Sequence, residues 1–243
     1  MTTELVLPGR YNGPAGSANG GFTCGSLADL VPHTAGSAVE VSLRRPPPLD
    51  TPMTVEDDHR LTIADDVVAE ARVVDLELDP VDAVPPDVAA EAMGRYPGAR
   101  SHPFPTCFAC GPDRAAGDGL RIFPGPVGDD RGHVASVWVP QPSHASGAAV
   151  DGLPTCGAAI TWAALDCVGG WSEDLAGRPC VLGRMTARID ASPVIGEPHV
   201  VVGRHLGRDG RKSFTASTLY DGSGRIVGSA RHTWLQVDPA TFN

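Results

Sequence analysis

The stretch "PTCGAAITWAALDCVGG", Pro154 to Gly170, carries the strongest pattern in the 243-residue chain. Its residues are apolar on nearly every helical face, so a helix made of them would be wrapped by other structure. Proline is a favourable first residue of a helix, and the pair Gly169-Gly170 indicates its end. We therefore predict a buried helix that begins after Pro154 and stops at the two glycines.

The segments that follow this helix are typical of strands. "VLGRMTARIDASPVIGEPHVVVGRHL" predicts a strand, a bend flanked by Pro193 and Pro198, and a second strand. "KSFTASTLYDGSGRIVGSARHTWLQV" predicts a hairpin whose turn is DGSG. The 23 prolines and 29 glycines of the chain also suit short strands joined by turns.

The same order of elements occurs earlier in the chain. A first buried helix is predicted from about Phe22 to Leu30, before Pro32. "SAVEVSLRRPPPLDTPMTVE" then predicts a strand, a proline-rich bend and a strand, and "HRLTIADDVVAEARVVDLEL" predicts two more strands with a turn at ADD. A proline-bearing connection over residues 80–105, with a short helix at 86–96, links the two parts.

This repetition predicts an α+β fold with an internal duplication. A helix wrapped by a curved antiparallel sheet is the hotdog arrangement, so we expect a double hotdog with two long buried helices, each wrapped by an antiparallel β-sheet. The N-terminal hotdog and its linker would occupy residues 1–100, and the C-terminal hotdog residues 101–243. Other α+β folds also fit the pattern.

Charge and composition restrict the partners. The chain has 29 acidic and 19 basic residues and a net charge of −10, which argues against nucleic acid or an anionic membrane as partner. The start "MTTELVLPGR" lacks the basic and apolar regions of a signal peptide, and no apolar run approaches the roughly 20 residues of a membrane span. We expect a cytoplasmic protein whose cysteines are reduced. Assembly of the chain into a homo-oligomer is also considered. Cys24, Cys156 and Cys167 are interpreted as small buried apolar residues.

The stretch "CFACGPDRAAGDGLRIF", residues 107–123, resembles a known family. It is similar to the N-terminal lead-in of single-domain hotdog thioesterases of the phenylacetyl-CoA thioesterase type. The matching residues are Cys107, Phe108, Cys110, Gly111, Pro112, Gly119, Leu120 and Phe123. The resemblance places the start of the second hotdog near residue 102 and implies an acyl-thioester substrate.

The Cys107–Cys110 pair allows other interpretations. Its spacing is that of a zinc knuckle, for which His102 could be a third ligand and His133 or His144 a fourth. A second close cysteine pair, which structural zinc sites usually have, is missing from the sequence. A redox pair would normally begin a helix beside a βαβ unit, whereas this one precedes a glycine-rich turn. We expect a packed turn that binds no metal and no cofactor, with zinc and redox as alternatives.

Thioester hydrolysis needs two kinds of group. Free N–H groups at a helix N-terminus can polarise the carbonyl, and a carboxylate can serve as base or nucleophile. The resemblance implies that each helix start faces the carboxylate of the other helix. Candidate catalytic residues are therefore Asn19, Gly20, Gly21, Asp29 and Asp166.

The stretch "SANGGFTCGSLADL" resembles a motif of the family: His-Gly-Gly, a short spacer, and then Leu-Ala-Asp. Asn19 stands where His is usual, and the spacing to Asp29 is one residue longer than in the family. Asn19 could alternatively cap the helix. We expect the N–H groups of Gly20 and Gly21 to form an oxyanion hole that faces Asp166.

Three functions compete. The leading hypothesis is hydrolysis of acyl-CoA or another acyl thioester. A non-catalytic acyl-binding or scaffold protein is favoured by the erosion of the second His-Gly-Gly motif, whose nearest match is Asp151-Gly152-Leu153. A hotdog dehydratase or hydratase would require a histidine in the tunnel, and the segment at His102 resembles that of dehydratases only superficially.

Overall fold

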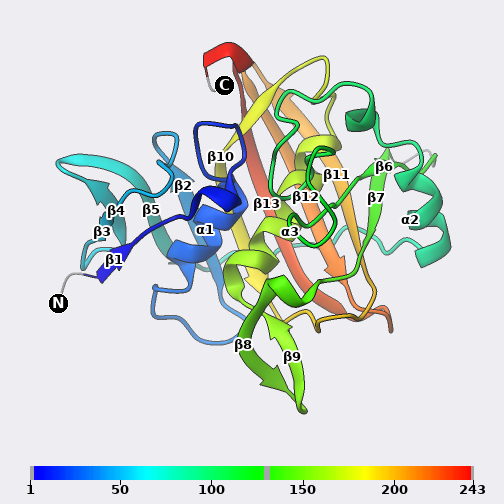
Figure 1. Ribbon diagram of the computed structural model, residues 1–243, viewed down its shortest axis with the longest axis horizontal. Helices are drawn as coiled ribbons and strands as arrows, with labels where there is room; N and C mark the ends of the chain where they lie inside the picture. Colours follow the sequence, from blue (N-terminus) through cyan, green and yellow to red (C-terminus); the bar gives the residue numbers. More distant parts are fainter. Residues whose placement is uncertain (1–2, 129–131, 242–243) are drawn as a thin grey trace.

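One large antiparallel sheet dominates the computed structural model, which describes residues 3–128 and 132–241 (Figure 1). The sheet contains eleven strands in the order β1-β3-β4-β5-β2-β10-β13-β12-β11-β7-β6, and β8 and β9 form a separate hairpin. The strands are β1 Thr3–Leu5, β2 Ala38–Leu43, β3 Met53–Val55, β4 Arg60–Ile63, β5 Asp66–Val74, β6 Gly125–Pro126, β7 His133–Trp138, β8 Ala145–Val150, β9 Leu153–Cys156, β10 Cys180–Ile189, β11 His199–Asp209, β12 Lys212–Tyr220 and β13 Ile226–Gln236.

The order of strands is symmetric about the pair β2 and β10. These two strands run antiparallel, with Val41 opposite Met185. Outward from β2 the order is β5, β4, β3 and β1, and outward from β10 it is β13, β12, β11 and β7, with the short β6 at the far edge. The strands predicted in the two parts of the sequence therefore join into one continuous sheet.

The helices are short. They are α1 Gly20–Ala28, α2 Pro86–Met93 and α3 Ala158–Trp171, and the 3-10 turns are η1 Gly9–Tyr11, η2 Pro97–Ala99, η3 Pro142–His144 and η4 Pro239–Thr241. The expectation of two long helices is not met, because α1 has only nine residues and α3 fourteen. The short helix expected at 86–96 is present as α2.

Both α1 and α3 lie on the same face of the sheet and pack against each other (Figure 1). Two glycines one helical turn apart make this contact close. A Cβ atom at Gly25 would lie 2.7 Å from the Cα of Ala159, and one at Gly21 would lie 2.8 Å from the carbonyl oxygen of Trp162. Only glycine allows the two backbones to approach this far, so α1 is held tightly against α3.

Both ends of the second helix differ from the prediction. Leu153–Cys156 forms strand β9, and the helix starts only at Ala158. It also runs through Gly169 and Gly170 instead of ending there. A Cβ at Gly169 would lie 2.7 Å from the ring of His232, so this glycine serves close packing of the helix on the sheet. The first helix likewise begins earlier than predicted, at Gly20.

The predicted turns are present. DGSG joins β12 to β13, and the N–H of Gly224 donates to the carbonyl of Asp221 across 2.9 Å. The two proline-flanked segments join β2 to β3 and β10 to β11. "RRPPPL" is therefore a bend between strands.

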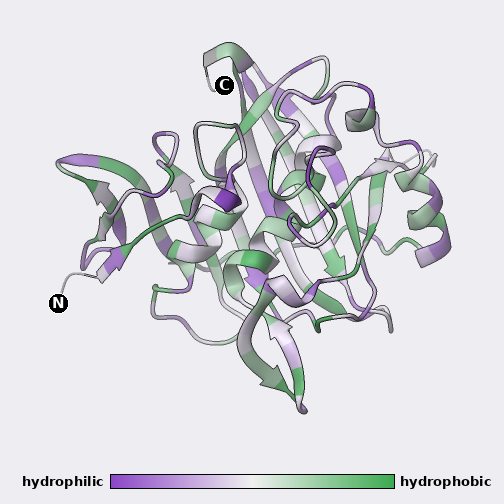
Figure 2. Cartoon of the chain, in the orientation of Figure 1, coloured by the Kyte–Doolittle hydropathy of each residue, from purple (hydrophilic) through white to green (hydrophobic). Residues whose placement is uncertain are grey.

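The β8–β9 hairpin extends away from the sheet (Figure 1) and was not predicted. Hydrophobic residues lie along it (Figure 2), and Val150 and Leu153 are half exposed. Within the described part of the chain, no helix is long and apolar enough to cross a membrane.

Candidate active site at the start of helix α1

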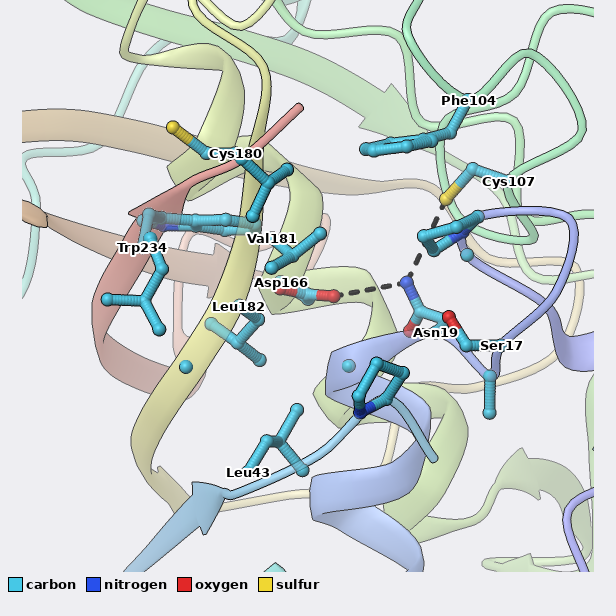
Figure 3. A pocket seen from close by; sticks show the side chains of 18 of the residues that line it. Ser17, Asn19, Leu43, Phe104, Cys107, Asp166, Cys180, Val181, Leu182 and Trp234 are labelled. Carbon is cyan, nitrogen blue, oxygen red and sulfur yellow. Dashed lines mark hydrogen bonds between the residues drawn. The ribbon is translucent and has the colours of Figure 1, made fainter. Parts of the chain in front are cut away.

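The N-terminus of α1 holds a carboxylate from α3 (Figure 3). Asn19 caps the helix, since its Oδ1 accepts the N–H of Phe22 at 2.8 Å. Its Nδ2 donates to Oδ2 of Asp166 at 3.1 Å, and the N–H of Gly21 donates to the same oxygen at 2.9 Å. The structure thus brings Asp166 into contact with Asn19 and Gly21, from which it is far apart in the sequence.

Asp166 is almost completely enclosed, with 2 % of its surface exposed. Burial raises the pKa of this carboxyl to about 7, although the hydrogen bonds from Gly21 and Asn19 favour its charged form. The positive end of the α1 dipole acts in the same direction as these hydrogen bonds. Oδ1 of Asp166 has no hydrogen-bond partner among the described residues. One carboxylate oxygen is therefore fixed by two donors, and the other is buried without a hydrogen-bond partner among the described residues.

The amides of the first helical turn have different partners. The N–H of Gly21 donates to Asp166, and that of Phe22 donates to Asn19. The N–H of Gly20 has no partner within residues 3–128 and 132–241, and Gly20 lines the adjoining cavity. Asp166, which was expected to face an oxyanion hole formed by the amides of Gly20 and Gly21, thus accepts the Gly21 amide itself, and the Gly20 amide is left toward the cavity.

A cavity of about 260 Å³ adjoins Asp166, and residues from both parts of the chain line it. Its apolar lining includes Leu43, Phe104, Val181, Leu182 and Trp234 (Figure 3). Arg44, Arg45 and Arg211 also line it, and all three are exposed, so they stand where the cavity meets solvent. Arg44 is paired with Glu70 and Arg45 with Asp66. The cavity suits a ligand with an apolar part and an anionic part.

Asp29 lies elsewhere. It follows the last turn of α1, its side chain is exposed, and it lines a second cavity of about 90 Å³. Ala158, the first residue of α3, lines the same small cavity. The structure therefore brings Asn19, Gly20, Gly21 and Asp166 together and leaves Asp29 beside the start of the other helix.

The Cys107–Cys110 pair lies next to the site. Sγ of Cys107 is 3.7 Å from Sγ of Cys167, which comes from α3 sixty residues further along the chain. Nδ2 of Asn19 lies 3.8 Å from each of these two sulfurs. Hydrogen bonds from the Cys110 and Cys167 thiols lower the pKa of the Cys107 thiol, whereas burial raises the pKa of Cys110. Cys167 was not predicted here, because nothing in its spacing connects it with the pair.

His102 also lines the cavity, but both of its ring nitrogens have neighbours. Nδ1 accepts the N–H of Phe104 at 2.9 Å, and Nε2 lies 3.4 Å from Sγ of Cys110. Burial lowers the pKa of His102. This histidine is not positioned as a free base toward the cavity.

The segment around the cysteine pair packs against the beginning of the chain. The N–H of Phe108 donates to the carbonyl of Asn12 at 2.7 Å, and the Phe108 ring meets that of Tyr11 edge-on. Tyr11 in turn stacks on Phe22 of α1. The lead-in segment therefore helps to hold the start of α1 in place.

Comparisons with known proteins identify the fold. No protein-family profile and no curated protein sequence matches the chain. Among solved structures it is similar to a proposed thioesterase from Novosphingobium aromaticivorans, with a TM-score of 0.62, 12 % identity, and coverage of 98 % of this chain and 96 % of that one. A conserved protein of unknown function with a hotdog fold, from Alicyclobacillus acidocaldarius, gives a TM-score of 0.60 at 12 % identity, covering 98 % and 94 %. The tesB protein of Mycobacterium avium subspecies paratuberculosis gives 0.55 at 13 %, covering 98 % and 93 %. These likenesses show that the chain has a hotdog fold.

Proposed function

We propose that this protein hydrolyses acyl thioesters, with acyl-CoA as the substrate class, in the cavity beside the start of α1. The observation that carries the proposal is the placement of Asp166. Its Oδ2 is fixed by Gly21 and Asn19, its Oδ1 is buried and unpartnered among the described residues, and the residue lines an apolar cavity. A carboxylate held in this way is suited to activating a water molecule.

The groups of the site supply the steps of such a hydrolysis. Oδ1 of Asp166 accepts a proton from water as the water oxygen attacks the acyl carbon. The N–H of Gly20 donates to the carbonyl oxygen, on which negative charge develops. The carbon–sulfur bond then breaks, and the proton passes from Asp166 to the leaving thiolate. Asn19 and Gly21 are positioning residues, since their donors are already bound to Asp166.

The cavity lining supports the choice of substrate. Its apolar side chains suit an acyl chain, and the exposed Arg44, Arg45 and Arg211 suit the phosphates of coenzyme A. Arg211 has no acidic partner within the described residues, whereas the other two are already paired. It is therefore the cation most available to an anionic ligand.

The strand order supports a double hotdog, divided near residue 100 into copies at 1–100 and 101–243. The two sets of strands follow the same sequence outward from β2 and β10. In addition, α1 precedes β2 and α3 precedes β10. This duplication would give the chain two helix starts, each beside the aspartate of the other helix.

An acyl-binding protein without turnover is the second candidate, and one observation favours it. The Gly21 amide is bound to Asp166, which leaves a single amide for the oxyanion. A dehydratase or hydratase is less well supported, because neither nitrogen of His102 is free of contacts.

A panel of acyl-CoAs, assayed by chromatography for free coenzyme A, tests the proposal. We expect hydrolysis of at least one member and a loss of about 100-fold or more in kcat for Asp166→Asn, the usual scale for a positioned base. Asp29→Asn is the matched control and should keep the parent rate.

The outcomes separate the candidates. If Asp166→Asn hydrolyses the best substrate at the parent rate, Asp166 is not the base. If the parent protein binds acyl-CoA but releases no coenzyme A, the acyl-binding function replaces the hydrolase.

A further inference from the structure

Three buried thiols form a cluster beside the site described above. Cys107 and Cys110 come from the loop that follows α2, and Cys167 comes from the middle of α3. Their sulfur atoms all lie within 4.8 Å of one another. Two of the three belong to a single Cys-x-x-Cys turn, which is a common way to present two ligands to one metal ion.

The spacing of these sulfurs fits a metal ion. A zinc–sulfur bond of about 2.3 Å and tetrahedral angles give a sulfur–sulfur distance of about 3.8 Å. The observed distance between Sγ of Cys107 and Sγ of Cys167 is 3.7 Å. A disulfide needs about 2.05 Å, so these two sulfurs are unbonded and separated by the edge length of a tetrahedral site.

His102 is a candidate fourth ligand, although in this structure its ring nitrogens do not lie within 4.8 Å of all three sulfurs. Its Nε2 lies 3.4 Å from Sγ of Cys110. Tetrahedral zinc with bonds of about 2.05 Å to nitrogen and about 2.3 Å to sulfur predicts about 3.6 Å for this edge. Because Nδ1 accepts the N–H of Phe104, a neutral ring now carries its proton on Nε2. Ligation through Nε2 therefore requires the proton to move to Nδ1 and the ring to give up its bond to Phe104.

The residues around the cysteine cluster suit the deprotonated, thiolate form that its sulfurs take when bound to a metal. Nδ2 of Asn19 lies within hydrogen-bonding distance of the sulfurs of both Cys107 and Cys167, at 3.8 Å. Such N–H donors around a thiolate site orient the ligands and offset their charge. The rings of Tyr96 and Trp171 pack around His102 and limit access of water. All four candidate ligands also line the cavity, which gives a metal ion a path to them.

We propose that Cys107, Cys110 and Cys167 bind one zinc ion, which ties the loop after α2 to helix α3, and that His102 moves in to complete the site as the fourth ligand. Thiolate-rich sites select zinc over magnesium or calcium. Binding releases the three thiol protons, and the metal then cross-links the loop after α2 to helix α3. This site goes beyond thioester hydrolysis and would exist in a catalytic or a purely acyl-binding protein. It replaces the expectation of a metal-free turn, because α3 supplies the thiol that no second cysteine pair provides.

Cobalt(II) is the probe for the test. The chain is reduced, stripped of metal with a chelator and titrated with Co²⁺. We expect one Co²⁺ per chain, with the thiolate-to-cobalt charge-transfer absorption and the strong visible bands of tetrahedral cobalt, and loss of both on addition of Zn²⁺. A rise in thermal midpoint on zinc loading is a second readout on the unaltered chain, so the test survives if a variant fails to fold.

Matched variants assign the ligands. Cys107→Ser, Cys110→Ser and Cys167→Ser should each weaken Co²⁺ binding by at least about 100-fold, since even outer-shell partners cost 10–100-fold. Cys180→Ser is the control, because Cys180 lines the same cavity outside the cluster and should leave binding unchanged. His102→Gln should weaken binding and alter the visible bands. An unaltered spectrum in that variant would overturn His102 as the fourth ligand.

Two results would overturn the site as a whole. One is a folded, reduced parent protein that shows no cobalt–thiolate absorption and no change of thermal midpoint with zinc. The other is a Cys107–Cys167 disulfide that forms in air while the reduced protein still binds no metal, which would make the cluster a redox pair.

Discussion

The starts of helices α1 and α3 each have a neighbouring aspartate, but the two aspartates differ in how deeply they are buried. At α1, the cap is Asn19, the helix begins with two glycines, and the facing Asp166 is 2 % exposed. At α3, the preceding Gly157 provides no side-chain cap, the helix begins with two alanines, and the neighbouring Asp29 is exposed. The cavities differ accordingly, at about 260 Å³ and about 90 Å³. A carboxylate near a helix start thus becomes a candidate site only when capping and burial fix it there.

Small residues account for much of this difference. Gly21 allows the Cβ of Asp166 to come so close to α1 that the Gly21 N–H can reach the carboxylate. Ala159, at the corresponding position of α3, carries a side chain. Asn19 adds a second donor to Asp166, which Gly157 cannot supply at the other helix.

The largest effect on stability is expected from Gly21→Ala. The new Cβ would lie 2.4 Å from the Cβ of Asp166 and 2.8 Å from the carbonyl oxygen of Trp162, so α1 must move away from α3. We expect the free energy of unfolding in urea to fall by about 2–3 kcal/mol, the upper range for overpacking.

Gly157→Ala is the control at the other helix start. Its nearest contact would be the Cβ of Ser146 at 3.3 Å, and the change should cost about 0.5–1 kcal/mol, because alanine is a poorer N-cap than glycine. Equal losses for the two alanine variants would show that the two helix starts are packed alike.

A smaller effect is expected from Asn19→Ala. The change removes the N-cap of α1 and one of the two donors to buried Asp166. We expect a loss of about 1–2 kcal/mol in urea unfolding at neutral pH, since loss of a cap typically costs about 1 kcal/mol. A stability within about 0.3 kcal/mol of the parent would mean that the cap does not distinguish the two helix starts.

The smallest effect is expected from supplying α3 with a cap. Gly157 has φ −79° and ψ 172°, which is the extended backbone of an N-cap residue. Gly157→Ser should therefore stabilise the protein by a few tenths of a kcal/mol, measured as a small rise in the urea midpoint. A clear loss of stability would show that the start of α3 is constrained by something other than its missing cap.

The sequence predicted the sheet better than the site. Alternating apolar residues and turn signals located most strands of both parts, including the hairpin at DGSG, because these signals are local. The helix starts were misplaced, and Gly169 and Gly170 were interpreted as an end because sequence alone does not reveal contact with the His232 ring. Asn19 and Asp166 were named as candidates, and the resemblance to hotdog thioesterases implied that the start of the first helix faces Asp166.

The links between site residues could not be derived in the same way. The occupation of the Gly21 amide by Asp166 depends on a tertiary contact between α1 and α3. The meeting of Cys107 with Cys167 likewise depends on how the loop after α2 folds onto α3. Neither contact leaves a local pattern in the sequence.

The central claim, that acyl chemistry belongs to the start of α1 alone, is tested most directly by a crystal structure with an acyl-CoA analogue. In the analogue a methylene group replaces the thioester sulfur, so that the carbonyl remains but cannot be hydrolysed. The account predicts that the carbonyl carbon lies beside Oδ1 of Asp166, with its oxygen toward the N–H of Gly20. An acyl group bound beside Asp29 at the start of α3, with the Asp166 cavity empty, would contradict it.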